Sequence, residues 1–282
     1  MRTSRARRLG CASGSSPEMF DAHLARWGLV PDGEPIITHS SRLLPVRQGG
    51  VPAMLKVALE PEERWGAVLM VWWNGDGAAR VLAHEGDALL LERAVGKASL
   101  VEMAQNGRDD EASRIICAVA ARLHAPRNRP PPELVPLQHW FRELDPAAAR
   151  YGGLLSKAAA AARELLANPQ DVVPLHGDIH HDNILNAGPR GWLAIDPKRL
   201  VGERGFDFAN IFCNPDLDTA TAPGRLARQA SVVAKEAGLE RTRLLRWILA
   251  YAGLSAAWIL GDGEEPELDL AVAGTAAAEL GI

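Results

Sequence analysis

Residues 175–185 read LHGDIHHDNIL, and residues 192–197 read WLAIDP. The apolar end of the first stretch and the apolar start of the second predict two short strands. AGPRG at 187–191 supplies the turn residues of a hairpin between them. Because the return strand runs antiparallel to the first, we expect Asp196, at its end, to lie beside Asn183.

Three oxygen-bearing side chains converge on this short element: Asp178, Asn183 and Asp196. Phosphoryl transfer needs such a set, because one carboxylate orients or deprotonates the acceptor hydroxyl while other oxygens hold Mg²⁺ against the nucleotide phosphates. The spacing from Asp178 to Asn183 equals that of the kinase pattern H-R-D-x-x-x-x-N. The pattern predicts Asp178 as the catalytic carboxylate, with Asn183 and Asp196 as metal ligands.

A lysine upstream completes the expected nucleotide site. Lys56 lies in a predicted strand and is the natural partner of the α- and β-phosphates. We expect Glu63, in the first turn of the following helix, to hold its ammonium group, although Glu60 and Glu62 compete for that role. Without the downstream motif, a strand lysine that faces solvent would be the simpler interpretation. Only five of the 31 Lys and Arg residues are lysine, so a retained lysine points to a need for its compact ammonium head.

The segment before residue 93 has the pattern of a small, mainly antiparallel sheet with one helix. Pro61 opens the helix, and carboxylates in its first turn suit the positive end of the helix dipole. A further short helix is predicted at 20–27. Short apolar runs between turn residues predict strands at 36–38, 43–46, 53–58, 79–83 and 88–91.

From residue 98 helical periodicity dominates, broken only at 172–196. The periodic runs are 100–104, 111–124, 138–144, 147–166, 226–237 and 244–259. The expected fold is α+β and two-lobed, with an N-terminal nucleotide-binding lobe at 19–92, a hinge at 93–97 and a larger, mainly helical lobe at 98–282. Residues 1–18, rich in Arg, Ser and Gly without an apolar segment, predict a disordered basic leader.

Composition limits the class of protein. The net charge is −4, and no apolar run approaches the roughly 18 residues of a membrane span. Because residues 1–18 are basic, the rest of the chain is more acidic, which argues against nucleic acid and is compatible with a cationic ligand. Cys11, Cys117 and Cys213 are far apart, which fits a reducing compartment. We expect a cytoplasmic monomer that binds neither membranes nor nucleic acid.

The histidines of the motif allow a second interpretation. His176, His180 and His181, interleaved with Asp178 and Asp182, have the look of a metal-hydrolase cluster. No histidine follows His181, so the distal ligands that a zinc hydrolase needs downstream are missing. Loop packing and hydrogen bonding are the simpler roles for His180 and His181.

HGDIHHDN followed by AIDP resembles the motif H-G-D-x-x-x-x-N of the aminoglycoside phosphotransferase family. Residues 72–82, 191–203 and 251–258 resemble its streptomycin 6-phosphotransferase and hydroxyurea-resistance kinase branch. The resemblance runs from about Phe20 to the C-terminus. It implies a protein-kinase-like fold, ATP and Mg²⁺, and transfer of the γ-phosphoryl group to a hydroxyl of an aminoglycoside such as streptomycin, which is an antibiotic-resistance activity.

The resemblance also implies roles for residues outside the catalytic set. Asp207, in GFDFA at 205–209, would brace the catalytic loop together with His176. The nucleotide-covering loop has no Gly-rich signature, so the hydroxyls of Ser40 and Ser41 and the backbone amides are expected to face the phosphates. Adenine would meet backbone groups of the hinge near Glu92.

Acidic residues of the second lobe are candidates for binding a cationic substrate. The run 262–269 carries five carboxylates and no basic residue, which is typical of a solvated loop. Glu264 and Glu265 of this run, with Asp216 and Asp218, would equally attract the two guanidinium groups of streptomycin. Lys198, which follows Asp196-Pro197, is compatible with a phosphate contact and with surface placement.

Two rival functions remain open. One is a kinase of the same fold that acts on a metabolite alcohol such as choline, homoserine or a sugar. The other is a catalytically silent pseudokinase that serves as a binding module. The intact set of Lys56, Asp178, Asn183 and Asp196 argues against the second.

Overall fold

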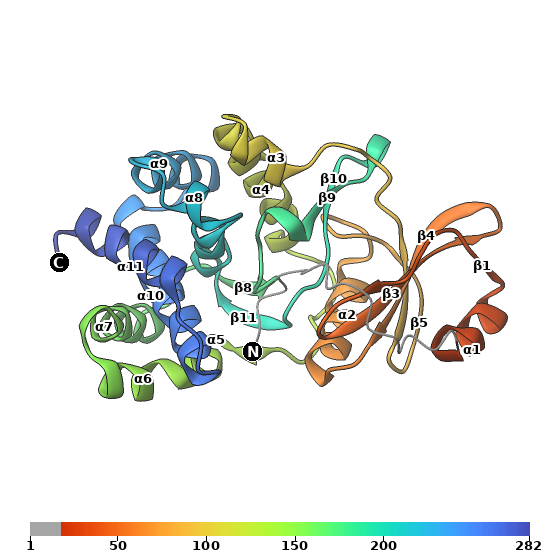
Figure 1. Cartoon of the computed structure of the whole chain (residues 1–282), viewed down its shortest axis with the longest axis horizontal. Helices are drawn as coiled ribbons and strands as arrows, with labels where there is room; N and C mark the ends of the chain where they lie inside the picture. The colour runs from red at the N-terminus through yellow and green to blue at the C-terminus, as the bar shows by residue number, and fades with distance from the viewer. Residues whose placement is uncertain (1–17) are drawn as a thin grey trace.

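The structure is a computed structural model that describes residues 18–282, with the side chains of residues 61–63 outside the description. An antiparallel sheet and a mainly helical part lie side by side in it (Figure 1). This confirms the predicted α+β, two-lobed fold. The predicted leader lies outside the described residues except for Glu18, where helix α1 begins.

The N-terminal lobe is a six-stranded antiparallel sheet with two helices. Its strand order is β1-β3-β4-β6-β5, and β2 pairs with β3. Strand β1 was not expected from the sequence. The elements are α1 (Glu18–Trp27), β1 (Leu29–Pro31), β2 (Ile36–Ile37), β3 (Ser41–Gln48), β4 (Val51–Ala58), α2 (Pro61–Trp73), β5 (Val81–Glu85) and β6 (Ala88–Glu92).

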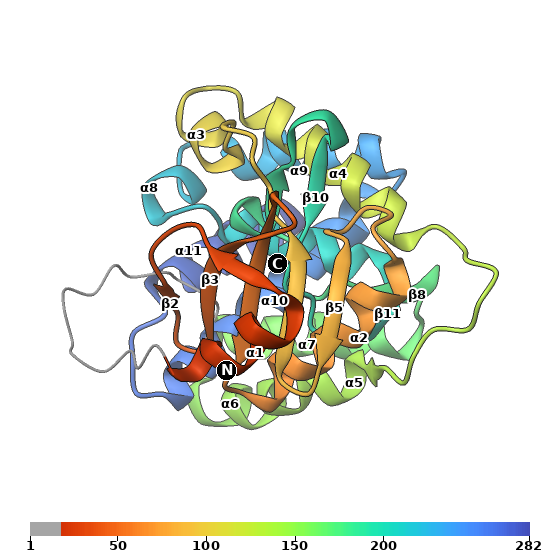
Figure 2. The same cartoon turned by 90° about the vertical axis from the view of Figure 1, so that its right-hand side faces the viewer.

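Alternation along β4 sets the direction of Lys56. Leu55 and Val57 belong to a small core that includes Phe20 of α1, and Figure 2 shows α1 crossing the near side of the strands. Successive side chains of a strand point to opposite faces of the sheet. Lys56 therefore points away from this core and meets Asp196 of the C-terminal lobe.

The C-terminal lobe is built around helix α10, which packs against α7, α11 and η4. Its helices are α3 (Leu100–Gln105), α4 (Asp109–His124), α5 (Leu137–Trp140), α6 (Leu144–Tyr151), α7 (Gly153–Ala167), α8 (Leu217–Ala220), α9 (Arg225–Ala237), α10 (Arg241–Gly261) and α11 (Glu267–Leu280). The 3-10 turns are η1 (Phe141–Glu143), η2 (His181–Asn183), η3 (Gly188–Arg190) and η4 (Arg204–Cys213).

Helix α10 has the length and apolar composition of a membrane span, the one such helix in the described part of the chain. Of its most apolar window, 78% is buried inside the protein. Residues such as Trp247, Ile248 and Leu254 lie in the main hydrophobic core. Helix α10 is therefore the core helix of this lobe, and a buried core explains its apolar character.

Two small sheets hold the sequence motif. β9 (Ile184–Asn186) and β10 (Trp192–Ala194) form the predicted antiparallel hairpin. β8 (Val172–Leu175) pairs with β11 (Leu200–Glu203), which also pairs in parallel with β7 (Val135–Pro136). The catalytic motif thus occupies the connection from β8 to β9, anchored at both ends by strand pairing.

The hairpin also contacts the N-terminal lobe and the segment that follows it. The backbone N–H groups of Ala79 in the lobe and of Gly96 after it donate to the carbonyls of Ala194 and Asn186, each at 2.9 Å. At Gly66 of α2, a Cβ atom would stand 2.3 Å from the carbonyl oxygen of Pro197, so only glycine permits this approach. These contacts fix the motif relative to both lobes.

One helix prediction and one loop prediction were wrong. The predicted single helix at 147–166 is broken at Gly152, whose φ of 66° separates α6 from α7. The acidic run at 262–269 is not a loop throughout, because α11 begins at Glu267 and Leu268 and Asp269 are buried. Alanine and leucine occur on both the buried and the exposed face of α11, so its sequence lacks the one-sided pattern by which a surface helix is recognised. Strands β7 and β11 were also not expected.

Candidate active site

The loop after β8 turns at Gly177, the middle residue of the HGD motif. Its φ is 81°, and a Cβ atom there would stand 2.8 Å from Leu200 Cδ1. Both features require glycine. The turn places His176 and Asp178 on either side of it, buried at the end of the small sheet.

The carboxylate of Asp178 has two different oxygens. Oδ1 accepts a hydrogen bond of 2.9 Å from Asn210 Nδ2 in η4. Oδ2 accepts no hydrogen bond from the described residues and lies 3.6 Å from Lys198 Nζ. One oxygen is thus held by the protein, and the other is available to an acceptor hydroxyl.

Asn183 and Asp196 lie at the same end of the hairpin. The N–H of Ile195 donates to the carbonyl of Asn183 at 2.9 Å, so Asp196 is the next residue after the partner of Asn183. The Asn183 amide nitrogen donates to the backbone carbonyl of Asp178, also at 2.9 Å, which leaves its amide oxygen for another ligand. A carboxylate and an amide oxygen fit Mg²⁺, which takes one or two protein oxygens together with phosphates and water.

Lys56 reaches across from the N-terminal lobe to this pair. Its Nζ lies 2.7 Å from Asp196 Oδ1, and only 5% of the residue is exposed. Burial alone would raise the pKa of Asp196, but the charge and hydrogen bond of Lys56, with the charge of Lys198, hold it below its ordinary value. The expected partner Glu63, like its rival Glu62, lies outside the described side chains.

Asp207 of η4 holds the backbone of the catalytic loop through hydrogen bonds. Its carboxylate accepts hydrogen bonds from the backbone N–H groups of His176 (2.9 Å) and Gly177 (2.7 Å). His124 Nε2 of α4 contacts the same carboxylate at 2.7 Å. The contact that the resemblance implied is present, and it joins the loop to η4 and α4.

The ring of His176 is held in one orientation. Its Nδ1 accepts from the N–H of Asp178 (3.2 Å), so Nε2 carries the proton that is donated to the carbonyl of Ile195 (2.8 Å). Trp73 stacks on the ring, with centroids 6.1 Å apart. Burial lowers the pKa of His176, which keeps it neutral. A neutral, fully bonded imidazole acts here as a structural link between Asp178 and the Asp196 strand.

The other residues expected at the nucleotide lie at two places in the N-terminal sheet. Ser40 and Ser41 are at the start of β3, and Glu92 is at the end of β6. Ser41 is buried, and its hydroxyl pairs with Thr38 Oγ1 at 2.9 Å. The Ser40 carbonyl accepts from the N–H of Leu59. The Glu92 carboxylate pairs with Arg190 and accepts from a backbone N–H, so its side chain joins the hinge to the hairpin.

The acidic candidates for substrate binding share no common contact among the described residues. Asp216 caps α8, accepting from the Thr219 N–H at 2.8 Å and from Gln105 Nε2 at 2.8 Å. Asp218, Glu264 and Glu265 are exposed. Their side chains are accessible to a cation in solution.

The metal-hydrolase interpretation finds no support in the part of the chain that the structure describes. No group of three or more His, Cys, Asp or Glu side chains there is placed to hold a metal ion. His180 Nδ1 accepts from the N–H of Asp182 at 3.3 Å, which caps η2. His181 is fully buried, and burial lowers its pKa to about 3. His180 and His181 are therefore buried parts of the loop.

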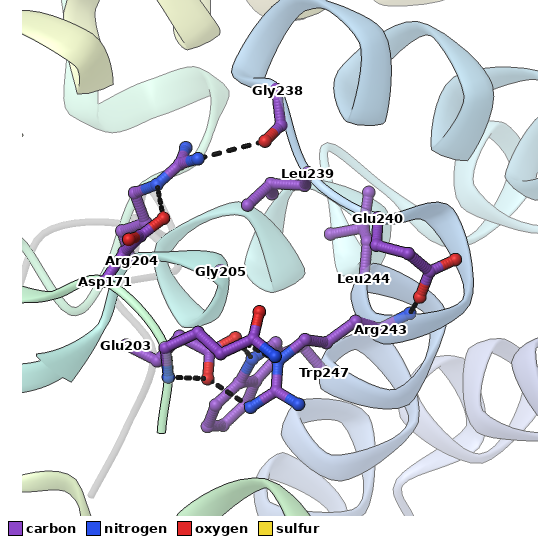
Figure 3. A pocket seen from close by; sticks show the side chains of 11 residues that line it. Asp171, Glu203, Arg204, Gly205, Gly238, Leu239, Glu240, Arg243, Leu244 and Trp247 are labelled. Carbon is purple, nitrogen blue, oxygen red and sulfur yellow. Dashed lines mark hydrogen bonds and ion pairs between the residues drawn. The ribbon is translucent and has the colours of Figure 1, made fainter. Parts of the chain in front are cut away.

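A pocket on the C-terminal lobe includes none of the predicted site residues. Figure 3 shows Glu203 and Arg243 pointing toward one another within it, with Arg204 beside Asp171. The Glu203 carboxylate also accepts from the Trp247 indole at 2.8 Å. These polar groups satisfy one another, which is the pattern of a structural network.

Sequence reasoning missed two side chains of the site. Asn210 holds Asp178, and His124 contacts Asp207. Asn210 lies three residues after Asp207 in the same 3-10 turn, so the spacing D-x-x-N was available as a signal. His124 comes from the end of α4, 83 residues before its partner, and no local pattern reveals it.

Comparison with known proteins shows the family of the chain. Residues 26–263 match the family described as aminoglycoside/hydroxyurea antibiotic resistance kinase. A streptomycin 3''-kinase of Klebsiella pneumoniae is 57% identical over 85% of this chain and 92% of its own length. A streptomycin 6-kinase of Streptomyces griseus is 33% identical over 88% of this chain and 84% of its own.

The fold has solved counterparts. A mutant of aminoglycoside phosphotransferase APH(4)-Ia, in a ternary complex with ADP and hygromycin B, superimposes with a TM-score of 0.63. The match covers 94% of this chain and 97% of that one at 14% identity, which shows the fold alone. The chain therefore belongs to the aminoglycoside/hydroxyurea antibiotic resistance kinase family and is a phosphotransferase with an alcohol group as acceptor.

Proposed function

We propose that this protein transfers the γ-phosphoryl group of ATP to a hydroxyl of streptomycin and so inactivates the antibiotic. The observation that carries the proposal is the Asp178 carboxylate, with one oxygen fixed by Asn210 and the other without a hydrogen bond from the described residues, 3.6 Å from Lys198 Nζ. The substrates named for the two relatives supply the choice of acceptor.

The residues have distinct roles in this reaction. Asp178 Oδ2 accepts the hydrogen bond of the acceptor hydroxyl and takes its proton as the new O–P bond forms. Lys56 binds the α- and β-phosphates, which requires its ion pair with Asp196 to rearrange when the nucleotide enters. Asn183 and Asp196 hold Mg²⁺, whose charge neutralises the phosphates when it is bound. Catalysis is then mainly positioning and charge neutralisation.

Accessible carboxylates support a cationic acceptor. Streptomycin carries two guanidinium groups, and Asp216, Asp218, Glu264 and Glu265 are the acidic residues that we propose for attracting them. Ser40 and Ser41 would face the phosphates, and the hinge near Glu92 the adenine. We place the enzyme in the cytoplasm, as a monomer with lobes at 19–92 and 98–282 joined at 93–97.

An ATP-consumption screen tests the proposal. The wild-type enzyme is assayed with Mg·ATP and streptomycin, other aminoglycosides, hydroxyurea, choline, homoserine and simple sugars. We expect consumption with streptomycin and a phosphorylated product by mass spectrometry, and NMR of that product identifies the modified hydroxyl. Turnover only with a metabolite alcohol would favour the housekeeping kinase, and none with any compound would favour the pseudokinase.

Variants of two carboxylates separate the roles. Asp178→Ala is expected to abolish transfer while it keeps most nucleotide affinity, whereas Asp196→Ala weakens binding of Mg·ATP. Asp182→Ala is the matched control, because Asp182 is an exposed carboxylate in the same loop. Near-normal turnover by Asp178→Ala would contradict the assignment.

A further inference from the structure

Lys198 lies at the centre of the site, although its sequence position left surface placement open. Its Nζ is 3.6 Å from Asp178 Oδ2, and its side chain is only 17% exposed. Its backbone N–H donates to the His176 carbonyl at 2.6 Å. The stem is packed at Gly177, where an added Cβ would stand 3.0 Å from Lys198 Cβ. The catalytic loop therefore holds both ends of this residue.

The position of Lys198 complements that of Lys56. Lys56 comes from the N-terminal lobe and pairs with Asp196, on the metal side of the site. Lys198 comes from the turn after Asp196 and faces the oxygen of Asp178 that receives the acceptor hydroxyl. The two cations thus stand on the nucleotide side and the acceptor side of the same pair of carboxylates.

The reaction changes what Lys198 faces. Before transfer it lies beside the ionised Asp178 carboxylate. As the hydroxyl proton passes to Asp178, an O–P bond forms to the acceptor and the P–O bond to ADP breaks. The carboxylate then becomes neutral, and negative charge remains on the oxygens of the transferring phosphoryl group. A cation placed at Oδ2 lies next to the carboxylate oxygen that receives the acceptor proton, which is where an attractive charge for those oxygens is needed.

We propose that Lys198 is a second catalytic cation, which contacts the transferring phosphoryl group from the acceptor side. The proposal rests on the phosphotransfer function given above. It assigns to the Asp-Pro-Lys turn the task that an arginine finger performs in other phosphoryl-transfer enzymes. The ammonium head of Lys198 is a compact point charge on a flexible stem, and its side chain is largely enclosed here, at 17% exposed.

The test compares Lys198→Met, Lys198→Gln and Lys198→Arg with the wild type. Lys157→Met is the matched control, because Lys157 is an exposed lysine on α7 of the same lobe. We expect Lys198→Met and Lys198→Gln to lower kcat with streptomycin by about 10²- to 10³-fold, with the KM for ATP changed less than about threefold. Lys198→Arg restores part of the loss, and Lys157→Met has no effect.

A binding measurement separates a catalytic cation from a structural one. Affinity for Mg·ADP, with and without aluminium fluoride, is measured by calorimetry without any acceptor. Aluminium fluoride mimics the transferring phosphoryl group, so Lys198→Met is expected to lose the extra affinity that this complex gives the wild type, while the affinity for ADP is kept. If the role of Lys198 were merely structural, the affinity for Mg·ADP without aluminium fluoride would fall, or the unfolding temperature would fall in all three variants.

Two outcomes would overturn the inference. One is kcat within threefold of wild type in Lys198→Met, and the other is an unchanged gain in affinity from aluminium fluoride. If the wild type does not turn over streptomycin, the proposed substrate is wrong, and the fluoride measurement still decides on Lys198. The two failures are therefore distinguishable.

Discussion

Replacing Asp207 by alanine should disconnect the catalytic loop from the core of the C-terminal lobe. The carboxylate is fully buried and accepts from the N–H groups of His176 and Gly177 and from His124. In Asp207→Ala two buried backbone N–H groups lose their acceptor, at a cost of about 1–3 kcal/mol each. We therefore expect the free energy of unfolding to fall by about 2–6 kcal/mol, a large part of the stability of an ordinary domain.

Urea unfolding followed by tryptophan fluorescence measures this change, since the chain has eight tryptophans. Asp207→Asn keeps the volume and one acceptor oxygen, so it should lose less than the alanine variant. Asp218→Ala, an exposed carboxylate that follows in the chain, is the control and should stay within about 0.5 kcal/mol of wild type. A loss below about 1 kcal/mol in Asp207→Ala would refute the view that this carboxylate holds the loop.

Three further outcomes follow from local geometry. Gly66→Ala should push α2 away from the Pro197 carbonyl and raise the KM for ATP, whereas Gly261→Ala, with open space around it, should leave the KM unchanged. Glu240→Ala should cost about 1 kcal/mol of unfolding free energy at pH 7, because the carboxylate caps α10. Burial alone would raise the pKa of Glu240, but the hydrogen bonds that its carboxylate accepts from backbone N–H groups hold the pKa below its ordinary value. The stability that Glu240 contributes is fully present above its ordinary pKa of 4.5 and is lost as the pH falls through its pKa in the folded protein. Urea unfolding at pH 3 should therefore show a smaller difference in unfolding free energy between Glu240→Ala and the wild type. Burial raises the pKa of Cys117 to about 12, so iodoacetamide at pH 8 should label it only after unfolding, as peptide mass spectrometry would record.

Much of the site follows from local sequence. The hairpin at 184–194 brings Asn183 and Asp196 to the same end of its two strands, because a turn of fixed length between two short strands sets their register. The glycine of HGD is needed by the sharp turn after β8. Both effects act over a few residues, so they can be worked out from the order of residue types without knowledge of the rest of the chain.

The helical lobe was harder to divide into elements. An alanine-rich run such as 147–166 has high helix propensity throughout, and the break at Gly152 depends on how α6 and α7 pack. Helix α11 was missed because it buries one face, at residues such as Val272, Ala273 and Ala276, while alanine, glycine and leucine also occur on its other face, which weakens the periodic contrast between polar and apolar positions.

The order of residue types is enough to predict the chemistry of this protein: the carboxylates and the amide of a phosphotransferase around a hairpin of local geometry, and a strand lysine upstream. Which side chains meet one another depends on how distant parts of the chain pack. Lys56 and Asp196 are 140 residues apart in the chain, and Asn210 lies 32 residues from the Asp178 that it holds. Such pairs form because the packing of the lobes and of η4 brings distant backbone together. The same packing turned Lys198 from an ambiguous lysine into a neighbour of the catalytic carboxylate.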